Sequence, residues 1–561
     1  MALKINERFS AREIRQYTFR AGLSRTEGGI MELVSEVYTS ILGALTLLTM
    51  AGALVVALRH SLGVGDVSAL AASAVAPGFH SVTLLQASAT VLLTLAASLL
   101  AVEMTMGPVA MTLPQTAWWL GLPVRRRGFI QPGFLKSLLW PSIAAVLVVL
   151  PLALGMAANP TPGNLALSVL CGLGLAWLLY GIAGWCQVTG SGAWLKKAMG
   201  AITLLAPLTL VATALYNNVA GTQAVTGAQT AWLEYLPTSW PLLVADGATW
   251  PLLLVALALG LLALVYLNLE RITTAALKES AAAGAYAASS LLSMDATELS
   301  RSLGAGQSSS NSKVRLPMVF RRGTVLARSV KTLASTHATM ALRSPATLLR
   351  VLVLAAIPAS LASVEFLGNA ILIAVAVYLC AYFAATSMGA TARFANGNPA
   401  VDMLMPLPAK TVRQVHFIVP GVAMTLWAAT CFGLLLALGV GSPALLLLAV
   451  LAGPGVGAAT LRAGFRPAPD WNMPAVATAS GPIPTGAIRA FLVGPDLTLI
   501  VLLPVLICLI AGGVPSIAFP FQLTLTWLAL LWGTHIRKPK SATDGGLFGM
   551  PAPGTTGAAG K

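Results

Sequence analysis

The chain has 561 residues, of which 57% are hydrophobic and only 9% are charged. Soluble domains carry about 25% charged residues, so this composition excludes an ordinary soluble protein. The net charge of +16 would suggest nucleic-acid binding in a soluble chain. We expect no nucleic-acid partner here, because the positive charges follow the boundaries of apolar runs and report on membrane topology instead.

The first 36 residues are basic, with apolar residues interleaved among the arginines. This pattern predicts an amphipathic helix lying on the inner membrane face, with its basic side chains towards the lipid headgroups. A merely solvated basic tail is the alternative. Residues 319–350 repeat the same basic, amphipathic character in the second half of the chain.

Twelve apolar runs of roughly membrane-spanning length follow these two segments, six in each half. The predicted spans are residues 38–58, 84–107, 138–158, 165–185, 198–216, 250–269, 351–367, 369–389, 417–440, 443–461, 497–512 and 515–533. The fold class is therefore all-α, a polytopic membrane protein built from two parallel six-helix repeats. The five cysteines lie in or beside these runs without CxxC spacing, and are expected to be small buried apolar residues.

The halves are separated by a Ser/Ala/Gly-rich stretch, which we expect to be a flexible cytoplasmic linker. The predicted domains are residues 1–272, the linker 273–318, the second membrane half 319–533 and a disordered cytoplasmic tail 534–561. With the N-terminus in the cytoplasm, every one of the 34 Lys and Arg residues except Arg59 falls on the inner side. This agreement with the positive-inside rule predicts cytoplasmic termini and a plasma-membrane location.

One loop pattern occurs in both halves, directly after the second span of each. Residues 113–128 read LPQTAWWLGLPVRRRG, and residues 403–413 read MLMPLPAKTVR. Each is a short apolar segment with a Leu-Pro pair followed by basic residues. Such a loop exposes too much apolar surface for an ordinary turn, so either lipid headgroups or a partner protein must cover it. Its recurrence favours a partner present in two copies.

The chain lacks the residues of several common mechanisms. It contains no G-x-x-x-x-G-K-[ST] motif, so it has no phosphate-binding loop of its own, and its outer loops form no metal-ligand or catalytic pattern. We expect no enzyme activity, bound cofactor or metal in the chain itself. Glu103 is the one acid well inside an early span, and is a possible polar site for coupling or substrate. Residues 234–247 suggest an interfacial or re-entrant segment, or simply an aromatic anchor.

The chain resembles permease subunits of ABC transporters of the type-2 exporter class, and looks like an actinobacterial member with two fused six-span units. The resemblance rests on the basic leading helix, the six spans per unit, and the sequences Leu122-Pro123-Val124-Arg125 and Leu407-Pro408-Ala409-Lys410. In such permeases the loop after span two is a coupling helix that docks on an ATPase subunit, which binds the ATP. The resemblance implies ATPase-coupling roles for Trp118, Trp119, Leu122, Pro123 and Arg125, and for Met403, Leu404, Leu407, Pro408 and Lys410. The second copy lacks the Trp pair and the triple Arg.

The function expected from this resemblance is ATP-driven export of an unknown, possibly hydrophobic substrate. The partners would be two copies of a separate ABC ATPase subunit and the surrounding membrane lipids. An ion-coupled secondary carrier is the alternative, although the scarcity of intramembrane charge counts against it. A non-transporting membrane scaffold is the third possibility.

Overall fold

The computed structural model describes residues 11–23, 84–157 except 110, 123 and 125, 161–220, 236–292, 324–364, 368–397, 406–466, 476–478, 481–483 and 493–535, with isolated positions between 45 and 59. Most of the first predicted span and nearly all of the predicted C-terminal tail therefore lie outside the described residues. So do Pro123, Arg125, Met403 and Leu404 among the predicted coupling residues.

All secondary-structure elements in the described part of the first half are helices. This half contains α1 (Ala11–Leu23), α3 (Leu84–Met106), α4 (Leu113–Trp118), α5 (Arg127–Ser137), α6 (Leu139–Met156), α7 (Pro162–Thr189), α8 (Ala193–Ala220), α10 (Trp240–Ala245), η2 (Trp250–Leu252), α11 (Leu253–Leu267), η3 (Leu269–Arg271) and α12 (Thr274–Leu292). Local signals explain the boundaries. Thr161 caps α7, Pro162 occupies its first turn, and Gly190 ends it in a left-handed conformation.

The second half repeats this composition of long helices, with one small addition. It contains α14 (Val325–Leu342), α15 (Pro345–Ala362), α16 (Ala370–Met388), α17 (Ala390–Gly397), α19 (Ala409–Ala437), α20 (Pro443–Gly464), α22 (Pro495–Ala511) and α23 (Ala518–Thr534). A short antiparallel pair, β1 (Val476–Thr478) and β2 (Gly481–Ile483), lies between α20 and α22. The all-α expectation did not include this pair.

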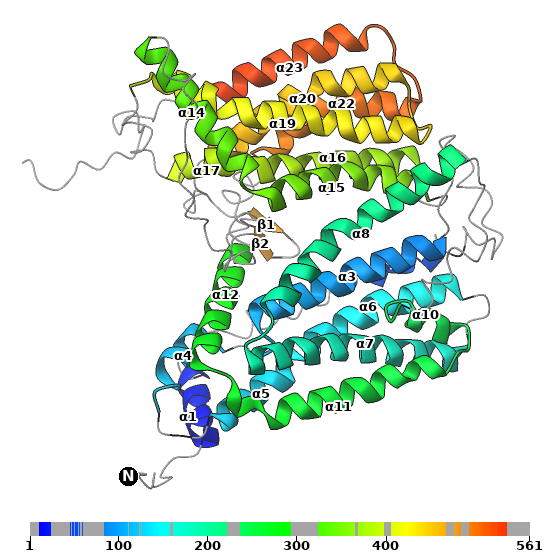
Figure 1. Cartoon of the computed structure of the whole chain (residues 1–561), viewed down its shortest axis with the longest axis vertical. Helices are drawn as coiled ribbons and strands as arrows, with labels where there is room; N and C mark the ends of the chain where they lie inside the picture. Colours follow the sequence, from blue (N-terminus) through cyan, green and yellow to red (C-terminus); the bar gives the residue numbers. More distant parts are fainter. Residues whose placement is uncertain are drawn as a thin grey trace, which may run out of the picture.

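Nine helices among the described residues are long and apolar enough to cross a membrane. The shorter apolar helix Pro495–Ala511 accompanies them. Figure 1 shows the long helices running side by side, with α3 to α11 in one group and α15 to α23 in the other. The prediction of an α-helical, multi-pass membrane protein is confirmed at this level.

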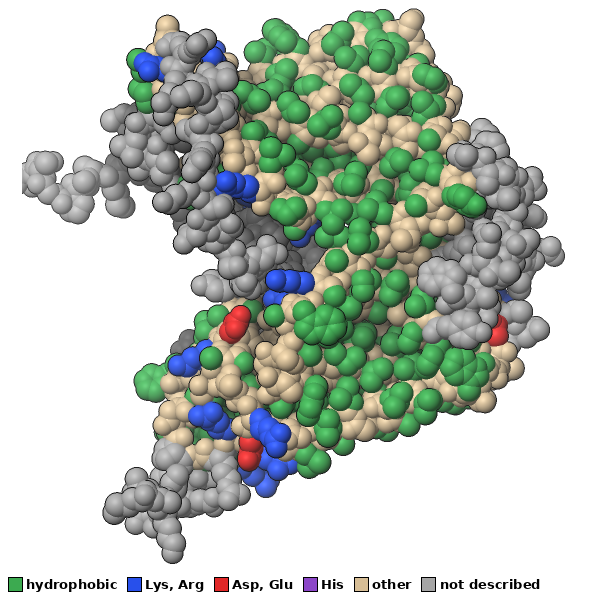
Figure 2. Space-filling view, in the orientation of Figure 1, with side chains coloured by type: hydrophobic (Ala, Val, Ile, Leu, Met, Phe, Trp, Pro, Cys, Tyr) green, Lys and Arg blue, Asp and Glu red, His purple; other side chains and the backbone are tan. Residues whose placement is uncertain are grey.

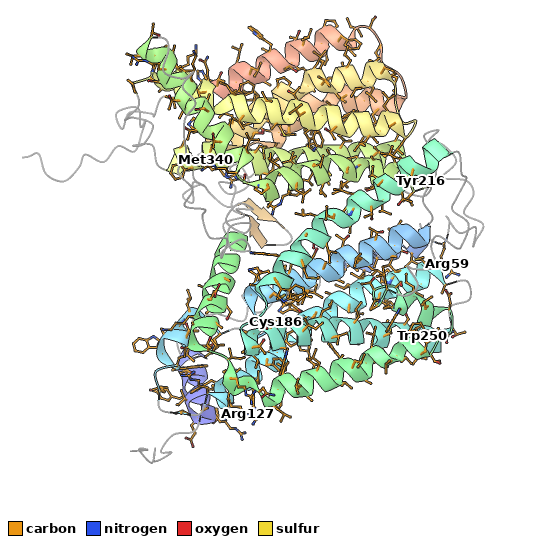
Figure 3. All side chains as sticks on the ribbon, in the orientation of Figure 1. Arg59, Arg127, Cys186, Tyr216, Trp250 and Met340 are labelled. Atoms are coloured by element: carbon orange, nitrogen blue, oxygen red, sulfur yellow. The ribbon has the colours of Figure 1, made fainter. Side chains whose placement is uncertain are left out.

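Charged residues gather at one end of these helices, which we call the basic end. Figure 2 shows Lys and Arg along this margin, whereas hydrophobic side chains cover the flanks of both helix groups. In Figure 3, Arg127 and Met340 lie at the basic end, while Arg59, Tyr216 and Trp250 lie at the opposite end. The helices α1, α4 and α14 also lie at the basic end (Figure 1). This separation is the one that the charge pattern of the sequence predicts.

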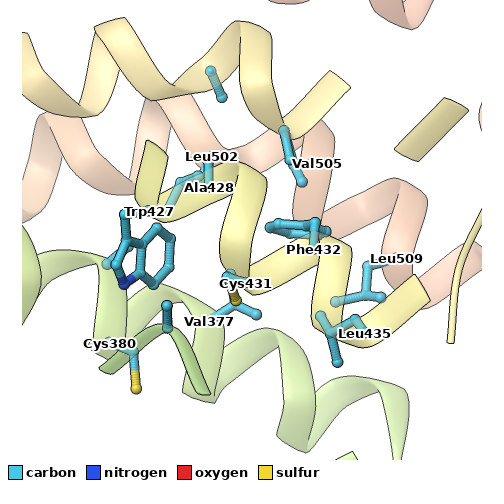
Figure 4. Close-up of a cluster of buried hydrophobic side chains, with 14 of the residues drawn as sticks. Val377, Cys380, Trp427, Ala428, Cys431, Phe432, Leu435, Leu502, Val505 and Leu509 are labelled. Carbon is cyan, nitrogen blue, oxygen red and sulfur yellow. The ribbon is translucent and has the colours of Figure 1, made fainter. Parts of the chain in front are cut away.

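The largest buried core lies in the second half and extends into the first. Figure 4 shows its centre, where Trp427, Cys431 and Phe432 of α19 pack between Val377 of α16 and Val505 of α22. Leu210, Val211 and Ala214 of α8 belong to the same core, because α8 packs against α15. The helix α8 therefore joins the two groups.

Several sequence-based boundaries differ from the structure. The span predicted at 138–158 starts earlier, since α5 and α6 form one helical stretch from Arg127 to Met156; long basic side chains can extend from such a helix to the membrane surface. The span predicted at 351–367 is α15, which begins at Pro345 and ends at Ala362.

The third difference concerns the linker. Its first part is α12, a helix of 19 residues that packs against α3 and α4. Leu277 and Ala281 of this helix are buried. The stretch is rich in alanine, which has the highest helix propensity of all residues, so it forms an ordered helix where the composition suggested a flexible chain.

Candidate functional site

The first coupling segment contains a short helix with a well-defined start. The hydroxyl of Thr112 accepts a hydrogen bond from the backbone N–H of Gln115, and the Gln115 side chain accepts one from the backbone N–H of Thr112. Such reciprocal capping satisfies two otherwise free donors at the beginning of a helix. Pro114 occupies the first turn, where its fixed φ angle suits a helix start. The chain therefore forms α4 immediately after α3.

Trp118 at the end of α4 and Trp119, its C-cap residue, differ in exposure. Trp118 is 77% exposed. Trp119 is half-buried and stacks on Phe129 of α5, with ring centroids 5.2 Å apart. The stack fixes the end of α4 against α5, so the exposed indole of Trp118 is presented from a supported position. The resemblance assigned the same role to both residues, but only Trp118 has the accessibility that docking would need.

Leu122 follows in the turn between α4 and α5 and is 40% exposed. Its backbone carbonyl accepts a hydrogen bond from the backbone N–H of Val124 at 2.8 Å. Trp118 and Leu122 together form an exposed apolar pair at the basic end of the molecule.

The second coupling segment has a different surface. Leu407 is half-buried and packs against Leu333 of α14 and against Val412 and Val415 of α19. Pro408 caps the start of α19 with an extended backbone, and both Pro408 and Lys410 are exposed. The described part of this segment therefore exposes a proline and a basic residue, whereas its leucine packs against α14 and α19.

A cavity of about 1430 Å³ lies beside α4 in the first half. Its walls come from α1, α3, α4, α5 and α6, with Tyr180 of α7 also at its surface. The helix α1 packs on α5, where a Cβ atom added to Gly128 would lie 2.6 Å from the Cβ atom of Ala11. This close approach lets α1 form one wall of the cavity.

Glu103 is part of the cavity wall. Both of its carboxyl oxygens are buried and have no hydrogen-bond partner. A charged carboxylate buried without a partner is very costly, so this group is under pressure to be neutral or to find a donor. The structure therefore places the intramembrane acid that the sequence identified beside the tryptophan segment.

Hydrogen bonds of the Tyr180 and Ser137 hydroxyls connect the helices around the cavity. The Tyr180 hydroxyl lies 2.7 Å from the carbonyl oxygen of Phe134, 3.0 Å from that of Pro108 and 2.6 Å from the Ser137 hydroxyl. These contacts join α7 and α5 to the chain just after α3. Gln187 strengthens the same junction, because its side-chain amide exchanges two hydrogen bonds with the backbone of Val109.

The basic end of the second half contains a histidine pair that the sequence did not reveal. His337 of α14 and His416 of α19 are both buried and stack with ring centroids 4.4 Å apart. Phe465 packs edge-on against His416. The guanidinium of Arg413 lies 4.5 Å from the centre of the Phe465 ring. Burial, together with the charge of a protonated His416, lowers the pKa of His337 to about 4.

The remaining charged cluster involves α20, α22 and α23. Arg462 forms an ion pair with Asp496 at 2.9 Å, and its guanidinium lies 4.0 Å from the centre of the Trp532 ring. Over the part of the chain that the structure describes, no group of three His, Cys, Asp or Glu residues could hold a metal ion.

The segment 234–247 also takes a definite form. It contains α10, which packs against α6 and α7, with Val244 and Ala245 buried. Trp240 of this helix contacts Trp250 edge-on, with ring centroids 4.7 Å apart. It lies at the end opposite α4 (Figure 1) and takes no part in the candidate site.

The helices and the charge separation define the chain as a multi-pass helical membrane protein. It belongs to a family described as "Family of unknown function (DUF6297)", which matches residues 81–474. The match extends over both Leu-Pro segments and the cavity walls formed by α3 to α6. No curated protein and no solved structure matches the chain.

Proposed function

We propose that the chain is the membrane-spanning permease subunit of an ABC transporter, which exports its substrate with energy from a separate ATPase subunit. The basic end would be the cytoplasmic face, and α4 with its following turn would dock on the ATPase. The observation that carries the proposal is the exposed pair Trp118 and Leu122 on a capped, stacked support. Rigidly presented aromatic and leucine side chains are typical anchors for a partner's groove.

The helix contacts support a fused duplication. In the first half α1 packs on α5, and in the second half α14 packs on α19. The contacts of α3 with α7 and α8 correspond to those of α16 with α20 and α22, and the contact of α7 with α11 corresponds to that of α20 with α23. We therefore propose twelve spans in two parallel six-span units, with the first span of each unit following a basic helix.

The docking segments would be unequal. Trp118 and Leu122 are exposed, whereas Leu407 is occupied by contacts with α14 and α19. An ATPase dimer would then hold the first segment through apolar anchors and the second mainly through Pro408, Lys410 and the residues before them. The two ATPase copies would differ in how tightly they bind the permease.

Co-purification tests this proposal. The tagged chain is solubilised from its native membranes in parallel with Trp118→Asp and with Trp194→Asp, a matched control because Trp194 is another strongly exposed tryptophan. We expect a protein with a phosphate-binding loop and ATP hydrolysis to accompany the wild type and the control, and to be lost from Trp118→Asp. Equal recovery from all three, or no such protein with the wild type, would contradict the proposal.

Glu103 favours one rival function, because a buried carboxyl beside a cavity is a common feature of proton-coupled carriers. The rival predicts substrate uptake into proteoliposomes that is driven by a pH gradient without ATP and is lost in Glu103→Gln. The permease proposal predicts no such uptake. The two functions are thus separated by one transport measurement with purified chain.

A further inference from the structure

The cavity in the first half combines a basic rim with apolar walls. Arg12 and Arg15 reach it from α1, and Lys136 reaches it from α5. Within the described residues none of these three cations forms an ion pair. Three unpaired positive groups around one cavity attract an anion, and they do so strongly where part of the surroundings excludes water.

The one acid of the cavity does not oppose an anion at this rim. Both carboxyl oxygens of Glu103 are buried, so the accessible surface of this residue lies on its other atoms. On α3, Glu103 also lies about one helical turn deeper than Gly107, whose neighbour Pro108 contacts Ser137 next to Lys136. Among the lining residues that the structure describes, the accessible charges are therefore all positive.

Most of the other described lining residues are apolar, although Gln16, Thr18, Gln115, Ser137 and Tyr180 add polar groups. Leu99 and Val102 of α3 and Ala144 of α6 form the part furthest from α1 along their helices. Trp140 of α6 also lines the cavity and is 75% exposed. Indole rings with this exposure are typical of the boundary between headgroups and acyl chains. Trp140 thus marks the side of the cavity that faces the membrane surface.

We propose that this cavity binds one anionic amphiphile, with a phosphate headgroup at Arg12, Arg15 and Lys136 and its apolar chain along Leu99, Val102 and Trp140. A free phosphate would leave the apolar walls uncovered, and an uncharged amphiphile would leave the three cations without a counter-ion. The volume exceeds the range of about 300–1000 Å³ that is usual for small-molecule sites, so there is room for a headgroup and a length of chain. The inference concerns binding and holds with or without an ATPase partner.

The test measures lipid binding by the full purified chain in detergent, using native mass spectrometry. The ligands are phosphatidylglycerol, phosphatidylcholine, inorganic phosphate and a cationic alkylammonium detergent. We compare wild type with the triple variant Arg12→Gln/Arg15→Gln/Lys136→Gln. The matched control is Arg328→Gln/Lys331→Gln/Arg350→Gln, which removes the same charge from residues outside the cavity lining.

We expect the wild type to bind phosphatidylglycerol at least about tenfold more tightly than phosphatidylcholine, and the cavity variant to lose that preference while the control keeps it. An equal loss in both triple variants would overturn the proposal, since surface charge alone would then explain binding. Binding of inorganic phosphate as tight as that of the lipid would also overturn it. So would tighter binding of the cationic detergent that disappears in Glu103→Gln.

A second variant separates the cavity from general instability. Ala144→Trp leaves every charge in place and fills the part of the cavity furthest from α1. We expect it to weaken long-chain phosphatidylglycerol several-fold while a short-chain form binds as it does to wild type. An identical effect on both chain lengths would contradict the placement of the chain along α3 and α6.

Discussion

At the basic end of each half one helix packs on another, but the residues at the two contacts differ. In the first half α1 packs on α5 at Gly128, and a cavity of about 1430 Å³ lies next to that contact. In the second half α14 packs on α19 through the stacked rings of His337 and His416 and through Leu333. One junction encloses space for a ligand, and the other is built around buried rings.

Under the proposed duplication, this difference would divide the roles of the two halves. The first half presents exposed Trp118 beside accessible cations, whereas Leu407 in the second half is half-buried against α14 and α19. Interior packing at close to crystal density resists change, so the second half is suited to be a rigid support. The first half has the empty volume and the exposed groups that binding requires.

The largest effect should come from the close helix contact in the second half. A Cβ atom on Gly457 would lie 2.5 Å from the Cα atom of Gly421, so Gly457→Ala forces α19 and α20 apart. Overpacking of this kind costs about 1–3 kcal/mol or more. We expect the thermal unfolding midpoint in detergent to fall by roughly 5 °C.

Two further substitutions, one in each half, test whether the fall depends on the tightness of the helix contact. Gly433→Ala meets nothing within 4 Å and should leave the midpoint unchanged. Gly184→Ala on α7 meets the side chain of Val265 at 3.0 Å, which can adjust, so a smaller fall is expected. A fall at Gly184 as large as that at Gly457 would show that the two halves are packed equally tightly, and would remove the contrast between them.

The second prediction displaces α1 from the first half. Gly128→Leu places a side chain where the Cβ atom alone would lie 2.6 Å from Ala11. We expect α1 to detach, which raises the rate of tryptic cleavage at Arg12 and Arg15 by about tenfold for a cost near 1.4 kcal/mol. Gly121→Leu is the control, because a Cβ atom there meets nothing within 4 Å.

Detachment of α1 should also remove two of the three cations from the cavity. Phosphatidylglycerol binding should therefore fall in Gly128→Leu and not in Gly121→Leu. If cleavage rises while lipid binding stays unchanged, α1 is no part of the binding site. The first half would then share with the second half a leading helix of purely structural use.

The third prediction concerns the effect of pH on the packing of α14 against α19. His337 has a pKa lowered from 6.5 to about 4 in the folded chain. His337 therefore binds a proton more readily in the unfolded chain than in the folded chain. The contribution of neutral His337 to folding stability is fully present above pH 6.5 and is lost as the pH falls towards 4. The ring of His416 faces His337 directly. The ring of Phe465 packs against His416, and Arg413 lies beside that phenyl ring.

Hydrogen exchange of α14 measures this effect. We expect exchange within α14, relative to its intrinsic rate, to rise several-fold between pH 7 and pH 5, and exchange within α1 to show no comparable change. His337→Phe keeps a ring against His416 and should remove most of the pH dependence. A wild-type profile that matches His337→Phe would show that the histidine pair does not control the packing of α14.

The sequence predicts the membrane architecture well because hydropathy and charge act locally. The span at 84–107 coincides with α3, and the predicted side of Arg59 agrees with its position away from Arg127 (Figure 3). Boundaries at helix ends fail where basic residues continue a helix, as at Arg127, since charge and hydropathy then disagree. The prediction of a flexible chain at the alanine-rich start of the linker was wrong for a related reason. The low complexity of this stretch suggested flexibility, although its alanines favour a helix.

The candidate site was only partly predictable. The sequence identifies Glu103 and the Trp118–Trp119 pair, but the direction of each indole depends on the stack with Phe129, ten residues further on. The cavity needs α1, α3 and α5 in place together, and no single segment carries that information. The histidine pair joins residues 79 positions apart, at 337 and 416, without any local signal.

The smallest effect is expected from Tyr180→Phe, beneath the cavity. The lost hydroxyl contacts the carbonyl oxygens of Pro108 and Phe134 as well as Ser137. A typical hydrogen bond contributes about 0.5–1.5 kcal/mol. The loss should lie at the lower end, because the Ser137 hydroxyl already donates to the Pro108 carbonyl at 2.6 Å and keeps that oxygen satisfied.

The measurement pairs the unfolding midpoint with phosphatidylglycerol binding, and Tyr216→Phe serves as the control because Tyr216 is exposed. We expect a fall of about 1–3 °C and unchanged lipid affinity, since the headgroup cations come from α1 and α5. A loss of affinity without a change in midpoint would place the headgroup at the Tyr180 hydroxyl instead. The ligand would then bind one helical layer deeper, and the first half would differ from the second in its buried polar network rather than at its rim.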